Sequence, residues 1–184
     1  LYSSAASDVY KRQVQHARIE AERLPAIQAL GSLMVYPHGA LRASPETIRA
    51  NSLGQSALWG LAISGDLPIL LLRWGGTNAS LVPLLIGAHQ LWRRHGLFVD
   101  LVIVQTPGSA YLEPLRSELA ELLRDIGASE MLGRSGGAHL VFSDQIGPEQ
   151  MCVLEATAWV ILDDTLGSLE EHLATRDHHA QLAP

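Results

Sequence analysis

The spacing of hydrophobic residues changes near residue 67, and the two parts of the chain predict different structures. Between residues 14 and 34, apolar residues recur at roughly helical intervals among charged ones, and Pro25 interrupts the pattern. One or two short helices are expected there. We therefore predict a helical segment with turns over residues 14–66.

A further helix is expected to begin after Ser44. Ser44 can cap its first turn, Pro45 suits the first helical position, and Glu46 favours the positive end of the helix dipole. The helix is expected to close over residues 51–55, with Gly54 as the residue that ends it.

From Leu67 onward, apolar runs typical of buried strands alternate with helical patterns. The predicted elements are strand 68–74, a helix capped by Ser80, strand 98–105, helix 112–126, strand 139–143, a helix from Pro148, and strand 160–162. Such alternation predicts parallel strands joined by right-handed crossovers. The expected fold class is α/β: residues 67–174 form a small Rossmann-like parallel sheet of three to four strands, flanked by helices and preceded by the helical segment. Residues 175–184 form a polar tail.

The head of the chain does not fit this pattern. DVYKRQ at residues 8–13 is what the codons GAT GTG TAT AAG AGA CAG encode, and that DNA resembles the transposon end used as a sequencing-library adapter. Lys11 is the only lysine of the chain, whereas the basic residues from Arg18 on are all arginine. We predict that residues 1–13 are a disordered, artefactual head, and we expect the natural protein to extend upstream of Val14.

Composition and charge exclude several functional classes. A hydrophobic content of 47% and a charged content of 17% are typical of globular chains. The formal net charge of -6 argues against nonspecific binding to nucleic acid or anionic membranes, since both require clustered Lys and Arg. Cys152 stands alone, so a disulfide framework or a cysteine metal site is excluded. No apolar run reaches the roughly 18 to 20 residues of a membrane helix, and we expect no membrane contact by this segment.

Ligands of open parallel sheets bind beyond the carboxyl ends of the strands, so the loop after strand 68–74 is a candidate site. Its Gly75 and Gly76 could present backbone N–H groups to an anion at a helix start. The loop lacks both GxGxxG and the lysine of a phosphate-binding loop, so an ordinary turn is the favoured interpretation. Asp163 and Asp164, at the end of the last strand, are expected to be solvated.

A polar turn, Ser64-Gly65-Asp66, directly precedes the buried strand. Ser64 or Asp66 could supply the nucleophile or carboxylate of a hydrolase. However, GxSxG is absent, no histidine is paired locally, and the turn lies at the amino end of the strand. We favour a structural turn in which Ser64 or Asp66 bonds to neighbouring amide groups.

Aromatic and histidine residues offer weaker signals. Trp59, Trp74 and Trp92 could stack on a sugar ring, although aromatic residues in an apolar pattern more often belong to the core. The histidines are scattered without i, i+4 pairing, and no metal site is predicted. No catalytic residue is assigned. The candidate ligand or structural positions are Asn51, Gln55, Trp59, Ser64, Gly65, Asp66, Gly75 and Gly76.

Five stretches carry a family resemblance. They are YPHGALRAS, NSLGQSALWGLAISGDLPILLLR, HGLFVDLVIVQ, HLVFSDQI and GSLEEHL. Their order and spacing resemble the cyclic β-1,2-glucan synthases, which are large bacterial inner-membrane proteins. The carboxyl-terminal part of those proteins is similar to the glycoside hydrolase family 94 phosphorylases, formerly glycosyltransferase family 36. The resemblance covers Val14 to about Ala174, and LGQSALWGLAISGDLPI is its specific part.

The resemblance implies a parent enzyme that builds, cyclises and trims β-1,2-glucan from a UDP-glucose donor, with this segment on the cytoplasmic face of the inner membrane. It places the segment near the phosphorylase-like modules. No DxD motif lies in a suitable loop and no catalytic carboxylate of the family maps onto the chain, so no catalytic residue or cofactor is implied for the segment itself. The implied partners are neighbouring domains of the same polypeptide, with a glucan chain as a further candidate.

Three functions are therefore considered. The favoured one is a noncatalytic structural module of a glucan synthase that orients neighbouring carbohydrate-active domains. A free-standing small-molecule or nucleotide-binding domain would use the Gly75-Gly76 loop, and ligand-dependent thermal stabilisation would reveal it. A hydrolase would use Ser64 or Asp66, and Asp66→Asn would then abolish turnover without unfolding the protein.

Overall fold

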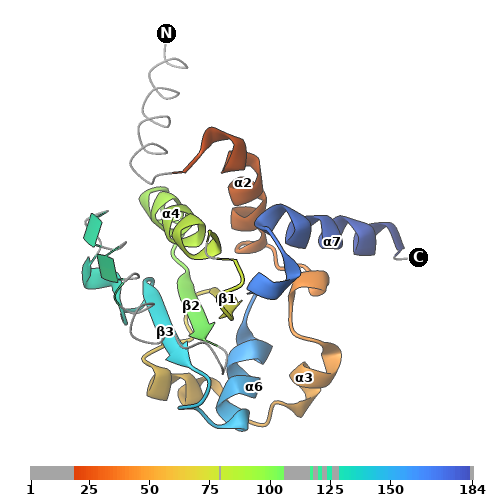
Figure 1. Ribbon diagram of the computed structural model, residues 1–184. Helices are drawn as coiled ribbons and strands as arrows, with labels where there is room; N and C mark the ends of the chain where they lie inside the picture. The colour runs from red at the N-terminus through yellow and green to blue at the C-terminus, as the bar shows by residue number, and fades with distance from the viewer. Residues whose placement is uncertain are drawn as a thin grey trace.

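A four-stranded sheet forms the centre of the molecule (Figure 1). The computed structural model describes residues 19–78, 80–105, 117, 120–121, 124–125 and 129–182. The strands are β1 (Ile69–Trp74), β2 (Asp100–Gln105), β3 (Ala138–Phe142) and β4 (Val160–Asp163). They lie in the order β3-β2-β1-β4, and all three pairings are parallel, which confirms the predicted α/β class. The predicted helix 112–126 falls largely outside the described residues.

The central strand β1 is buried on both of its faces. Successive side chains of a strand point to opposite faces of the sheet. Leu70 and Leu72 therefore join one hydrophobic cluster, whereas Ile69 and Leu71 join a second one. None of these four residues is more than 1% exposed. The continuous apolar run in the sequence thus corresponds to a strand covered by two layers.

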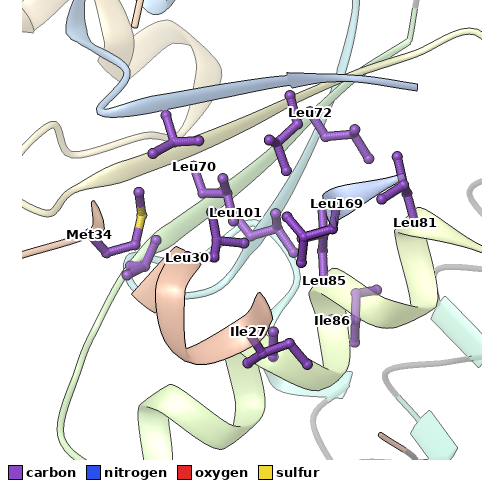
Figure 2. Close-up of a cluster of buried hydrophobic side chains, with 14 of the residues drawn as sticks. Ile27, Leu30, Met34, Leu70, Leu72, Leu81, Leu85, Ile86, Leu101 and Leu169 are labelled. Carbon is purple, nitrogen blue, oxygen red and sulfur yellow. The ribbon is translucent and has the colours of Figure 1, made fainter. Parts of the chain in front are cut away.

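One layer consists of three helices, α2 (Leu24–Leu33), α4 (Leu81–Arg94) and α7 (Leu169–Leu182). Figure 2 shows Leu30 of α2, Leu85 of α4 and Leu169 of α7 gathered around Leu70 and Leu101 of the sheet. Helices α2 and α4 bury apolar stripes in this cluster, and α7 contributes Leu169 and Leu173 to it. Such packing, more than helix propensity, stabilises helices in proteins.

The opposite layer consists of the 3-10 helix η3 (Gln55–Leu61) and α6 (Pro148–Thr157), and α3 (Pro45–Ala50) packs against α6. Leu58 of η3 and Val153 of α6 pack with Leu71 and Val102 of the sheet. In Figure 1, α3 lies beside α6 on this side of the molecule. The helical segment predicted over residues 14–66 is therefore divided between the two faces: α2 packs on one face of the sheet, whereas η3 packs on the other, where α3 lies against α6. Shorter 3-10 helices are η1 (Ala21–Arg23), η2 (Gly39–Leu41), η4 (Ser129–Met131) and η5 (Asp164–Leu166).

The start of α3 confirms its sequence signal, but its end does not. The Oγ atom of Ser44 accepts a hydrogen bond from Thr47 N at 3.2 Å. The helix ends at Ala50, before Gly54, because the Oδ1 atom of Asn51 accepts from Leu53 N at 3.1 Å and turns the chain. Gly54 instead precedes η3.

Two other sequence signals act differently from the prediction. Pro25 does not break a helix; it lies in the first turn of α2, where its missing N–H group has no partner to lose. Ser80 makes no side-chain cap for α4. That turn is held instead by the Oδ1 atom of Asn78, which accepts hydrogen bonds from Ser80 N at 3.2 Å and Ser80 Oγ at 2.7 Å.

The order of the strands determines where a ligand crevice would lie. The connection from β1 to β2 passes through α4 on one face, and the connection from β3 to β4 passes through α6 on the other. The neighbouring strands β1 and β4 therefore flank the topological switch point of a doubly wound sheet. Such folds bind ligands beyond the carboxyl ends of the strands at this point.

Candidate functional site

At the switch point, three backbone N–H groups of the loop after β1 converge on one carboxylate. Gly75 N donates to the Oδ1 atom of Asp164 at 2.9 Å. Thr77 N and Asn78 N donate to its Oδ2 atom at 2.7 and 3.2 Å. Gly76 adopts a φ of 86°, in the region that favours glycine, and so permits the tight turn of the loop. The loop is an anion-binding arrangement whose anion is a side chain of the protein itself.

Asp164 is buried, with 2% of its surface exposed, so the prediction of a solvated residue was wrong. A buried carboxylate is tolerated when hydrogen-bond donors satisfy its oxygens, and here backbone N–H groups do so. Asn78 makes a second link across the same edge, because its Nδ2 atom donates to Gly167 O at 3.2 Å. The N–H groups that were expected to serve a ligand therefore join the ends of β1 and β4.

At the amino ends of the strands, hydrogen bonds join the Ser64-Gly65-Asp66 turn to η3. The Nε2 atom of Gln55 donates to Ser64 O at 2.9 Å and to the Oδ1 atom of Asp66 at 2.8 Å. The Nε1 atom of Trp59 donates to the same Ser64 carbonyl at 3.3 Å. The structure thus brings together five of the candidate positions in one hydrogen-bonded unit.

Gly65 is required by the geometry of this unit. Its φ is 75°, and a Cβ atom at this position would lie 2.6 Å from the Cγ atom of Gln55. The Ser64 hydroxyl accepts from Asp66 N at 3.2 Å and lies 3.3 Å from the Oγ atom of Ser135. In the described part of the chain, Ser64 has no histidine partner that could act as a base. The geometry is that of a closed turn.

Asn51 lies apart from the turn, since within the described residues its side chain bonds locally, to Leu53 N. Gly75 and Gly76 lie at the other edge of the sheet, with Asp164. The eight candidate positions therefore do not form one site. They divide into the turn unit, the switch-point loop and the end of α3.

A buried polar pair at the amino end of the sheet was missed by the sequence analysis. The Nε2 atom of His139 lies 3.3 Å from the Oδ1 atom of Asp100, which also accepts from Gly136 N at 2.6 Å. Both side chains are almost fully buried. The signal available in the sequence was Asp100 inside an apolar strand pattern. A buried charge needs a partner, so this aspartate indicated a buried polar contact. The pair joins β2, β3 and the loop before β3.

His89 lies near this pair and is also buried. Its Nε2 atom donates to Val99 O at 2.9 Å, which connects α4 to the start of β2. Burial lowers the pKa of His89, and the positive charge of Arg93 contributes in the same direction. His89 is therefore a neutral packing residue.

The tryptophans differ sharply in their exposure. Trp74 and Trp92 are each 6% exposed and belong to the core, which removes them as sugar-stacking candidates. Trp59 is 66% exposed. No group of three or more potential metal ligands occurs among the residues described. Within the same residues, no helix is both long and apolar enough to span a bilayer.

Comparison with known proteins gives one informative relative. No protein-family model matches the chain. In an alignment 167 residues long that covers 88% of the chain, it is 30% identical to the cyclic beta-(1,2)-glucan synthase NdvB of Rhizobium meliloti strain 1021. The chain spans 6% of the length of that protein. Most of this chain is therefore related to one short region of a cyclic glucan synthase.

Proposed function

We propose that this chain is a noncatalytic structural module of a protein resembling the cyclic β-1,2-glucan synthases. The observation that carries the proposal is that the carboxylate of Asp164, a residue of the chain itself, accepts the hydrogen bonds of the N–H groups in the switch-point loop. A doubly wound sheet that binds a nucleotide offers such groups to phosphate. Here they hold two strand ends together, and the similarity to a glucan synthase supplies the context.

The turn unit supports the same proposal. Ser64 lacks a histidine partner in the described structure, and Gln55 and Trp59 both donate to its carbonyl oxygen. These contacts orient the backbone and leave no activated nucleophile. They explain the turn as the entry to the buried strand β1, in preference to the hydrolase hypothesis.

For the parent protein, we propose synthesis of β-1,2-glucan from UDP-glucose, in a polypeptide whose related modules belong to glycoside hydrolase family 94, formerly glycosyltransferase family 36. The module would lie on the cytoplasmic face of a bacterial inner membrane. Its partners would be neighbouring domains of the same polypeptide and the glucan chain. No cofactor is proposed for the module.

The proposal is tested in the complete polypeptide that contains this chain. Incorporation of glucose from UDP-glucose into glucan is measured for Ser64→Ala and Gly65→Ala. We expect Ser64→Ala to retain synthesis. Gly65→Ala should lower synthesis only in proportion to the loss of folded protein, because it strains the turn. Loss of synthesis in Ser64→Ala with unchanged unfolding would show a catalytic role and refute the proposal.

The nucleotide-binding alternative is tested on the 184-residue chain. A ligand that binds the folded state raises the melting temperature with increasing concentration. We expect UDP, UDP-glucose and inorganic phosphate to leave the melting temperature unchanged. A concentration-dependent increase would favour the alternative.

A further inference from the structure

Trp59 is a large aromatic side chain that is exposed and yet held in place. Two-thirds of its surface, 66%, is accessible to solvent. Its Nε1 atom donates to Ser64 O at 3.3 Å, which fixes one edge of the indole ring. The carbonyl that receives this bond is itself held by the Nε2 atom of Gln55 at 2.9 Å. The ring is therefore oriented before any partner binds, and binding would require little further ordering.

Exposed polar groups lie directly beside the ring's anchor. Gln55 and Asp66 are both exposed and are joined by a hydrogen bond of 2.8 Å from Nε2 to Oδ1. A carboxylate has a second acceptor oxygen, and a glutamine side chain has a carbonyl oxygen. Trp59 and Gln55 both bond to Ser64 O, so an apolar ring and these acceptors lie on one rigid turn.

This combination matches the chemistry of a sugar ring. One face of a glucopyranose presents C–H groups, which stack on an indole, while its hydroxyl groups donate hydrogen bonds to carboxylate and amide oxygens. A nucleotide is a poorer match, because the negative charge of Asp66 repels phosphate.

We propose that Trp59, Gln55 and Asp66 form a surface binding site for one glucose ring of a β-1,2-glucan chain. This inference rests on the proposed function, since the parent's glucan supplies the ligand. The turn unit thus has two roles: Gly65 and the hydrogen bonds to Ser64 set its shape, and its exposed side contacts the glucan. The site lies at the amino ends of the strands, on the edge opposite the Asp164 loop.

The test uses the 184-residue chain and a linear β-1,2-linked gluco-oligosaccharide as the probe. Binding is measured by isothermal titration calorimetry to about 10 mM, which covers a weak site with a Kd of about 1 mM. We expect the wild type to bind. Trp59→Ala should weaken binding about tenfold or more, because an aromatic anchor dominates such a contact. Asp66→Asn, which keeps the shape, should weaken it less.

Two variants control for folding and for nonspecific stacking. Trp59→Phe keeps an aromatic ring but loses the Nε1 donor, so it should bind between the wild type and Trp59→Ala. Tyr36→Ala removes an aromatic side chain that is 78% exposed in the turn after α2, and should bind like the wild type. If Trp59→Ala unfolds, Trp59→Phe and Asp66→Asn decide the outcome.

Three results would overturn the inference. These are no binding by the folded wild type, equal binding by the wild type and the Trp59 variants, and competition by UDP for the same site. Failure here is distinct from failure of the proposed function, because glucose incorporation by the complete polypeptide carrying Ser64→Ala is measured independently of this site.

Discussion

The Oδ2 atom of Asp164 accepts a hydrogen bond from Thr77 N at 2.7 Å, across the carboxyl ends of β4 and β1. This contact joins the two strands at the place where a doubly wound fold holds its ligand. The loop after β1, which binds a ligand in other proteins of this topology, here holds the ends of β1 and β4 together. We call this contact the Asp164 brace.

Asp164→Asn should destabilise the protein by about 1–3 kcal/mol, because an amide nitrogen would then face partly buried backbone N–H donors and leave them unpaired. Urea denaturation measures the change. Asp163→Asn is the matched control: in the described part of the chain, the hydrogen bonds of the Asp163 side chain are to Thr165, in an exposed turn, and its replacement should cost less than about 1 kcal/mol. Equal effects of the two variants would contradict the brace.

Asp164→Ala should create an anion site by exposing the N–H groups of Gly75, Thr77 and Asn78. Inorganic phosphate should then raise the melting temperature of the variant but not that of the wild type. If phosphate does not raise the melting temperature of the variant, the loop is not an anion-binding arrangement.

Gly65→Ala should destabilise the turn by about 1–3 kcal/mol, since alanine is strained at positive φ and its Cβ atom would approach Gln55. Gly54→Ala is a suitable control in the same segment, because a Cβ atom there meets nothing within 4 Å. The free energies of unfolding are compared by urea denaturation. A neutral Gly65→Ala would show that the turn can relax.

Gln55→Glu should be more destabilising than Gln55→Ala at neutral pH. Alanine loses the hydrogen bonds to Ser64 O and Asp66, at about 1 kcal/mol each or less for exposed groups. Glutamate loses the same donors and also places a second negative charge beside Asp66. Stability of the glutamate variant should recover relative to alanine below about pH 4, where carboxyl groups take up protons. If the stability difference between Gln55→Glu and Gln55→Ala were the same at neutral pH and below about pH 4, the contact between residue 55 and Asp66 would be contradicted.

His89 should make the protein less stable in mild acid. Its pKa is lowered in the folded state by burial, so below about pH 6.5 the unfolded chain binds a proton that the folded chain does not. The free energy of unfolding should then fall with decreasing pH, by up to about 1.4 kcal/mol per pH unit, until the lowered pKa is reached.

His89→Gln isolates this contribution, because glutamine can still donate to Val99 O but does not titrate. The neighbouring ionisable groups, Arg93, Asp100 and His139, are present in both proteins. The difference between the two pH profiles is therefore assigned to His89. Parallel profiles would show that His89 does not contribute.

The amino-acid sequence determined the class of the fold through its hydrophobic pattern. The run from Ile69 to Leu72 is apolar at every position, as expected of a strand covered on both faces, and all four residues are buried. Ser44 and Pro148 marked helix starts because capping and the φ of proline are local effects. The Ser64-Gly65-Asp66 turn was recognisable for the same reason.

Tertiary structure alone decided the roles of residues that act over long sequence separations. Asp164 follows β4 and resembles any polar strand end in the sequence; it is buried because the order β3-β2-β1-β4 brings the loop after β1 to its carboxylate. Trp59 and Trp74 are the same residue type, yet Trp59 is exposed and Trp74 lies in the core. Local sequence patterns determine the local backbone conformation. The burial of a side chain and its hydrogen-bond partners depend instead on which distant segments come into contact, because that contact removes surface from water and supplies the partners.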